Sequence, residues 1–444
     1  MKHSFPKLWV VLTVVFIIYS CHHIDLPGAP AKKYSNEVAL AWINLQQRMI
    51  KTTPGFGPGP AGRSFAYSGL AMYESIVPGM PSYQSFLLQI APITSPPPFD
   101  RDKKYFWPAS VNASMKTILT GFFTGGSIAS GISAANKFSI DSLDAVYRNK
   151  FASQAPQDEL SRSSILGAGI ASYVFDWSKT DGTFAVNPPY TSPMGVGLWV
   201  PTFPGFGPPI NPYGGQLRSF TPNLLSSLTI LPPVPYSEIP GSQFYEMNKF
   251  LYDKSLVLTT DEINIAKTWG DIPGNYNGPA HFTNVLTQLI AKERLPLDEA
   301  AVLYARHGIA IYDATIPIFK AKYQYNVMRP ITYIRSKLNH PDWNTVIPTP
   351  AHPEYLSAHA VIAQACAEVL KERFGNHYSF RDHTHDDLFG TRSYSTFDEY
   401  AAESGWSRVL AGIHFQPTAE ASLIVGKKVG QLVNALNFKK GKGY

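Results

Sequence analysis

The sequence predicts an all-α protein, a multi-helix bundle whose functional residues lie on helices of its C-terminal half. Over most of its 444 residues, apolar side chains recur every three or four positions, which is the period of a helix with one buried face. Helix boundaries carry matching signals, with acidic residues opening the segment at Thr260-Asp261-Glu262 and Gly375 closing a later one. We find no internal repeat, coiled-coil heptad or low-complexity tract.

Taken in order, the helical pattern is interrupted once over a long stretch. Helices are expected at 36–51, 63–76, 109–123, 142–151, 157–177, 242–256, 260–269, 281–292, 297–323, 357–375 and 417–437. From 180 to 240, prolines recur with aromatic residues between them, and such a long irregular excursion usually covers a site in a compact enzyme. We therefore divide the chain into an N-terminal helical half, 34–240, which includes this excursion, and a second helical bundle, 241–438.

The N-terminus reads as a targeting segment. Lys2 and Lys7 precede an apolar run, 8–19, which suits a signal peptide and is too short to span a bilayer. A signal peptide of residues 1–20 would leave Cys21 as a lipidated residue in a sequence that resembles a bacterial lipobox, with 21–33 as a tether. Ordinary cleavage near Ser20 is the alternative. We expect an exported protein, a lipoprotein of the bacterial cell envelope anchored to a membrane in the periplasm or at the outer membrane.

Composition limits the possible partners. The net charge of +6 comes without a long Lys/Arg run, so nucleic acid is not expected as a partner, and the excess suits a site for anions. The chain has two cysteines. If Cys21 is lipidated, Cys366 has no disulfide partner, and its place on an apolar helix face predicts a buried, inert thiol.

The stretch His352-Pro-Glu-Tyr-Leu-Ser-Ala-His359 is the predicted centre of that site. Prolines block a helix upstream of it, and Ser357 stands where an N-cap is expected. A helix start offers free N–H groups and a positive dipole to an oxyanion. Ser357 adds a hydroxyl, Ala358 an accessible backbone N–H, and His359 a proton donor.

Two other stretches supply cations. Lys322 and Arg329 lie seven residues apart, a spacing that predicts one helix face. Arg408 and His414 are six apart and would not share a face of a continuous helix. Gly412 and Pro417, however, predict a break that turns His414 back toward Arg408. Three permanent cations converging in a core would repel one another without an anion.

In order, these pieces read Lys-x6-Arg-Pro, Leu-Ser-Ala-His and Ser-Arg-x3-Gly-x-His. Together they resemble the three-part signature of the superfamily of type 2 phosphatidic acid phosphatases and vanadium-dependent haloperoxidases, in its bacterial haloperoxidase-like lipoprotein branch. The central piece there is usually Pro-Ser-Gly-His, so Leu356 and Ala358 depart from the pattern. The third usually carries an Asp four residues after its His. Here that position is Thr418, and Glu420 is the nearest acid.

The resemblance implies a vanadium-dependent haloperoxidase-like enzyme that oxidises halide with hydrogen peroxide. His359 would be the general acid/base, and His414 would ligate vanadium. Vanadate would be held by Lys322, Arg329, Ser357, Ala358, Arg408 and His414. The acceptor for the second ring nitrogen of His414 would be Glu420 or a backbone carbonyl, and the missing Asp favours the haloperoxidase.

Two other functions stay open. An acid or lipid-phosphate phosphatase could use the same residues on a phosphate ester, through a phosphohistidine at His414. A non-catalytic lipoprotein could hold phosphate without turnover.

Three further features have an open role. The segment 376–396 is rich in His and Asp, and we interpret it as a solvated lid rather than a metal cluster, because its spacing fits no closed site. Trp269, Asp271 and His281 could line the mouth of the site or pack in the core. Arg63 could face the anion, and a surface or helix-terminal salt bridge is the alternative.

Overall fold

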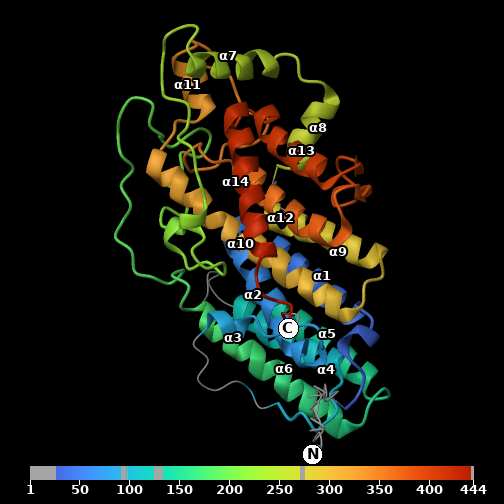
Figure 1. Cartoon of the computed structure of the whole chain (residues 1–444). Helices are drawn as coiled ribbons and strands as arrows, with labels where there is room; N and C mark the ends of the chain where they lie inside the picture. The colour runs from blue at the N-terminus through green and yellow to red at the C-terminus, as the bar shows by residue number, and fades with distance from the viewer. Residues whose placement is uncertain (1–26, 92–96, 98, 125–133, 271–275, 442–444) are drawn as a thin grey trace, which may run out of the picture.

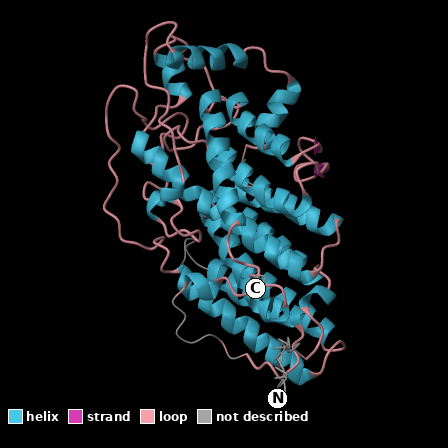
Figure 2. Cartoon of the chain, in the orientation of Figure 1, coloured by secondary structure: helices cyan, strands magenta, loops and turns pink. Residues whose placement is uncertain are grey.

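The chain folds into one helical assembly, seen in a computed structural model that describes residues 27–91, 97, 99–124, 134–270 and 276–441 (Figure 1). Its described part contains a single pair of short strands, β1 (Phe380–Asp382) and β2 (Arg392–Tyr394), so the all-α prediction is confirmed (Figure 2). The helices are α1 (Glu37–Thr52), α2 (Pro58–Ile76), α3 (Leu87–Ile90), α4 (Trp107–Thr124), α5 (Ala134–Phe151), α6 (Gln157–Ser178), α7 (Gln243–Ser255), α8 (Thr260–Thr268), α9 (Gly278–Lys292), α10 (Leu297–Tyr325), α11 (Pro330–Ser336), α12 (Ala358–Phe374), α13 (Phe397–Leu410) and α14 (Gln416–Asn434).

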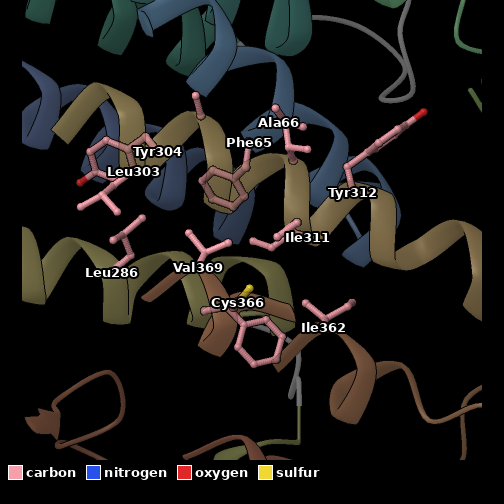
Figure 3. Close-up of a cluster of buried hydrophobic side chains, with 14 of the residues drawn as sticks. Phe65, Ala66, Leu286, Leu303, Tyr304, Ile311, Tyr312, Ile362, Cys366 and Val369 are labelled. Carbon is pink, nitrogen blue, oxygen red and sulfur yellow. The ribbon is translucent and has the colours of Figure 1, made fainter. Parts of the chain in front are cut away.

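The centre of the molecule is the contact between α2 and α10. A Cβ on Gly69 would lie 2.4 Å from the carbonyl oxygen of Tyr304, and one on Gly308 would lie 2.6 Å from that of Phe65. The two backbones therefore touch at positions that admit only glycine. Figure 3 shows side chains of α2 and α10 meeting Leu286 of α9 and Val369 of α12 in one cluster. One continuous core therefore contains residues from both the N-terminal half, 34–240, and the second bundle, 241–438.

Helices α12 and α14 form a second close seam. A Cβ on Gly426 would lie 2.3 Å from the carbonyl oxygen of Val361, and one on Gly430 would lie 2.6 Å from that of Ala365. Cys366 lies on α12 and is fully buried, as the apolar helix face predicts, and burial raises the pKa of its thiol. The seam fixes the start of α12 against the start of α14.

The segment between α6 and α7 crosses the assembly as an extended strap, which forms the long loop in Figure 2. Its helical structure is limited to two short 3-10 turns, Gly214–Gln216 and Leu225–Ser227, and Leu198 forms an isolated β-bridge with Val327. The N–H of Trp199 donates to the carbonyl of Asn326 at 2.7 Å, and that of Ile210 donates to the carbonyl of Ala351 at 2.9 Å. The strap is therefore bonded to the two segments that lead into Arg329 and His352.

The prediction of one helix face for Lys322 and Arg329 is wrong. Helix α10 ends at Tyr325, Asn326 turns the chain with a φ of 47°, and Arg329 is the N-cap of α11. Pro330 explains the break, because a proline disfavours helical geometry in the residue before it. Lys322 and Arg329 thus approach each other across a turn.

The expectation of a solvated lid at 376–396 is also wrong in part. Strands β1 and β2 pair in an antiparallel hairpin, and Asp382 and His385 are buried while His383 is exposed. Among the described residues no cluster of His, Cys, Asp and Glu could hold a metal ion.

Arg63 forms an ion pair, although the pair is buried rather than at the surface. Its Nε donates to Asp181 Oδ2 at 2.6 Å and its Nη2 to the carbonyl of Ser178. None of the described helices is long and apolar enough to cross a membrane. Cys21, the predicted signal peptide and Asp271 lie outside the described residues.

Glu74 gives the fold a testable pH dependence. The side chain is buried on α2, where its Oε1 accepts the N–H groups of Phe86 and Leu87 at 2.8 Å each, and burial raises its pKa to about 7. Because folding favours the protonated form, the contribution of Glu74 to stability is complete below about pH 4.5. This contribution to the free energy of unfolding falls by up to about 3 kcal/mol as the pH rises to 7.

Glu74→Gln should flatten the stability–pH curve between about pH 4.5 and 7, measured by chemical unfolding. Asp387→Asn, at an exposed acid, should leave the slope unchanged, and a wild-type slope in the Gln variant would contradict this account.

Candidate active site

The segment from His352 to His359 forms the floor of the site. Ser357 is the N-cap of α12, in extended backbone geometry with a ψ of 114°. Its N–H donates to Ser422 Oγ at 2.9 Å, and that hydroxyl in turn donates to the carbonyl of Thr418. The amides of Ala358 and His359 belong to the first turn, where N–H groups have no partner within the helix. The floor is thereby tied to α14, and the start of α12 lies within it.

Lys322 approaches the floor from the last turn of α10. It is fully buried, and its Nζ donates to the carbonyls of Pro353 at 2.8 Å and Glu354 at 3.0 Å. Burial lowers the pKa of the ammonium well below its ordinary value, and the positive charges of Arg329 and Arg408 lower it further. The charge of Lys322 is therefore costly without a nearby anion.

Arg329 is fully buried as well. Its Nε donates to the carbonyl of His352 at 2.9 Å, and its Nη1 to that of Ile413 at 2.7 Å. Nη2 lies 2.9 Å from Nδ1 of His352, a half-buried ring that the sequence analysis did not assign to the site. Burial lowers the pKa of Arg329 to about 9. Within the described part of the chain, neither Arg329 nor Lys322 forms an ion pair with a carboxylate.

Arg408 and His414 come together as the glycine and proline pattern predicts. Helix α13 ends at Leu410, Gly412 has a φ of 77°, and the N–H of His414 donates to the carbonyl of Arg408 at 3.2 Å. The Arg408 guanidinium donates through Nη1 to the carbonyl of Trp269. His414 Nε2 lies 3.3 Å from Arg329 Nη1. The break thus turns the imidazole into the group of cations.

Glu354 is the acceptor that the sequence analysis missed. Its Oε1 lies 2.9 Å from Nδ1 of His414 and accepts the N–H of Phe415 at 3.1 Å, while Oε2 accepts the hydroxyl of Thr418 at 3.0 Å. With Nδ1 donating to this carboxylate, Nε2 keeps its lone pair for the site. Glu420 is exposed and bonds Gln416, so its predicted role is wrong. The available signal was an acid three residues before Ser357, inside the very stretch assigned to the site.

The electrostatics of the cluster favour an anion. Burial, together with Arg329, Lys322 and Arg408, lowers the pKa of His414 well below its ordinary value, so the ring is neutral. Burial also raises the pKa of Glu354 to about 7. Among the described residues, Lys322 and Arg329 have the Glu354 carboxylate as a negative neighbour, and this carboxylate already receives three hydrogen bonds. A tetrahedral oxyanion would compensate their charge.

A second, independent observation also fits an oxyanion at this site. The hydroxyl of Ser357 is buried and has no hydrogen-bond partner among the described residues. A buried hydroxyl of this kind is suited to hydrogen-bond a ligand, because leaving it unpaired costs stability. Cations, a free hydroxyl, helix-start amides and a neutral imidazole nitrogen together fit vanadate or phosphate.

His359 stands two residues beyond Ser357 in the first turn of α12. Its side chain is half-buried, and its ring meets the ring of Phe282 at a centroid distance of 6.2 Å. The predicted role of His359 in proton transfer stays a prediction. The result is a candidate oxyanion site at the start of α12, with His352 before the N-cap Ser357 and His359 after it.

The comparisons with known proteins agree with this class of site. Residues 302–440 match the family model described as the VCPO second helical-bundle domain. A bacterial vanadium-dependent iodoperoxidase has 26% sequence identity and a TM-score of 0.80, with 91% of this chain and 97% of that chain covered. A bacterial vanadium-dependent chloroperoxidase in its holo form has 14% identity and a TM-score of 0.62, with 88% and 95% covered. Its apo form has 13% identity and a TM-score of 0.63, with 92% and 100% covered. A search of curated proteins found no match.

A candidate oxyanion site at the start of a helix in an all-α bundle suggests the class of protein. The match of residues 302–440 to a haloperoxidase domain and the likeness to the iodoperoxidase support the superfamily of vanadium haloperoxidases and type 2 phosphatidic acid phosphatases, as the three-part signature implies, and a haloperoxidase-like enzyme.

Proposed function

We propose that the protein is a vanadium-dependent haloperoxidase that oxidises halide with hydrogen peroxide. The observation that carries the proposal is the Arg329–His414–Glu354 arrangement, in which a neutral imidazole nitrogen held by a carboxylate lies 3.3 Å from a buried guanidinium. The resemblance of 91% of the chain to a bacterial vanadium-dependent iodoperoxidase supports the choice of vanadate. Export and lipidation at Cys21 stay predictions from the sequence.

The residues of the site divide the work as follows. Lys322, Arg329 and Arg408 would hold the oxyanion and balance its charge, and Ser357 with the Ala358 N–H would bind its oxygens. His414 would offer Nε2 as the ligand, with Nδ1 held by Glu354. Vanadate, when bound, would supply a Lewis acid that activates hydrogen peroxide. His359 would move the protons of the peroxide.

The discriminating experiment measures two activities on one preparation. Halide oxidation with hydrogen peroxide is assayed with and without added vanadate, and hydrolysis of a phosphate ester is assayed alongside. The proposal expects oxidation that depends on vanadate. Ester hydrolysis with a phosphohistidine at His414, and no oxidation in the presence of vanadate, would reject it.

A phosphatase is the second candidate, and one observation favours it. The missing Asp at Thr418 was the argument against a nucleophilic His414, but Glu354 supplies the acceptor that such a histidine needs. The dyad therefore suits either chemistry, and resemblance to the iodoperoxidase decides the order of preference.

Anion binding itself can be tested without turnover. Vanadate or phosphate should raise the melting temperature of the wild type, because a ligand that binds only the folded state stabilises it, by about 2.7 kcal/mol at 100 times its Kd. Arg408→Ala should lose most of this shift, since a buried cation that faces the anion is removed. Arg381→Ala, at an exposed arginine of the hairpin, should keep it. Equal shifts in all three proteins would show that the anion binds elsewhere.

A further inference from the structure

We propose that Asp382, acting through His281 and Trp269, is a positioning residue for Arg408 and so sets the affinity of the site for its oxyanion. The inference rests on the proposed function, because it concerns the same anion. It assigns a role to three residues that make no contact with Lys322, Arg329 or His414 in the described hydrogen bonds. The path runs from the β hairpin, through the start of α9 and the end of α8, to the guanidinium.

The first step is a buried His–Asp pair. His281 Nε2 lies 2.7 Å from Asp382 Oδ2, and each residue is 2% exposed. The other carboxylate oxygen, Oδ1, accepts the N–H of Thr384 at 2.9 Å and its hydroxyl at 2.5 Å. Burial alone would raise the pKa of Asp382, but His281 and Thr384 outweigh it and hold the pKa at about 2. A fixed, ionised carboxylate therefore orients the imidazole.

The second step is a stack between His281 and Trp269. Their ring centroids lie 4.3 Å apart with planes at 19°, a face-to-face contact. At its edge, Trp269 Nε1 donates to Glu403 Oε1 at 3.3 Å. The indole is thus fixed by a ring on one face and a carboxylate at its polar edge, which leaves it a single orientation.

The third step reaches the site. The carbonyl of this same Trp269 accepts a hydrogen bond from Arg408 Nη1. The neighbour of His281, Phe282, meets the Trp269 ring at 5.7 Å and the His359 ring at 6.2 Å. The start of α9, oriented by Asp382, therefore touches the site on two sides, at the cation through Trp269 and at His359 through Phe282.

Packing alone does not account for this arrangement. A buried polar pair is a weak source of stability, and apolar residues of similar volume often serve as well or better. What the pair supplies is orientation, because a charged hydrogen bond fixes the ring more tightly than dispersion does. A guanidinium that binds an oxyanion through two N–H groups has to be held in one orientation. A carbonyl in a fixed position holds it there.

The test replaces Asp382 by Asn, which keeps the shape and removes the charge. The affinity for vanadate, measured by calorimetry on the full chain, should fall by about 10-fold, the lower end for an outer residue of a metal site. The tryptophan fluorescence should also change, because the ring stacked on Trp269 is released, and Trp269→Phe identifies that signal. Asp386→Asn is the matched control. It breaks an exposed His383–Asp386 pair, also 2.7 Å long, in the same segment, and should change neither readout.

The outcomes are distinct. Asp382→Asn with wild-type affinity overturns the inference. A lower melting temperature with unchanged affinity also overturns it and leaves a structural role. If Asp382→Asn does not fold, His281→Gln, which can still donate to Asp382 but cannot stack as an imidazole does, must lose affinity for the inference to stand. A wild type that binds no vanadate rejects the proposed function first, and the inference with it.

Discussion

Replacing His414 by alanine should remove vanadate-dependent halide oxidation and weaken vanadate binding by more than about 100-fold. Loss of an outer residue of a metal site already costs 10- to 100-fold, and His414 would be the ligand itself. Its Nε2 lies 3.3 Å from the buried guanidinium of Arg329, while Nδ1 of the same ring is held by Glu354. Binding is measured by calorimetry, and oxidation by a halide assay.

The control for this variant is His377→Ala, at an exposed histidine between α12 and the hairpin. It should keep full activity and affinity. A His414→Ala protein that folds and still binds vanadate as tightly as the wild type would contradict the assignment of this ring as the ligand.

Replacing Glu354 by glutamine should have the second-largest effect, with vanadate affinity lowered by roughly 10- to 100-fold. The carboxylate orients His414 and accepts two further hydrogen bonds, so an amide in its place weakens all three and can also present a donor to Nδ1. The unfolding free energy should fall too, by roughly 3–5 kcal/mol, because the buried Lys322 and Arg329 lose a negative neighbour. Glu420→Gln, at the exposed acid, should change neither quantity.

A second substitution sharpens this test. Thr418→Asp restores the acid at the usual position of the superfamily signature, but it would place a carboxylate against Oε2 of Glu354 and should destabilise the fold. The double variant Glu354→Gln/Thr418→Asp moves the charge instead of adding one. It should recover part of the lost affinity, and a double variant no better than Glu354→Gln would show that position 418 cannot substitute.

The sequence was most informative where local chemistry decides the structure. Helix period, Ser357 as N-cap and Gly375 as the end of α12 are local properties, and so is the break between Arg408 and His414. Each depends on residues within about one helical turn, which is the range over which capping and backbone preferences act.

The parts that could not be predicted depend on contacts distant in sequence. Glu354 meets His414 across 60 residues, and Asp382 meets His281 across 101. No spacing rule reports such pairs. The error at Arg329 has a different origin, because helical spacing was extended past Asn326 into a turn that Pro330 imposes.

The way the floor segment is held bears on how fast the site can be filled. Arg329 and Lys322 are fixed by the carbonyls of His352, Pro353 and Glu354, and the N–H of Glu354 donates to the carbonyl of Val327. These bonds are between parts of the protein and exist before any ligand arrives. Little side-chain entropy is then lost on capture, and no rearrangement of the cations has to precede it. Loading should follow a single kinetic phase whose rate is proportional to oxyanion concentration and slows with salt, as attraction to preformed positive charges implies.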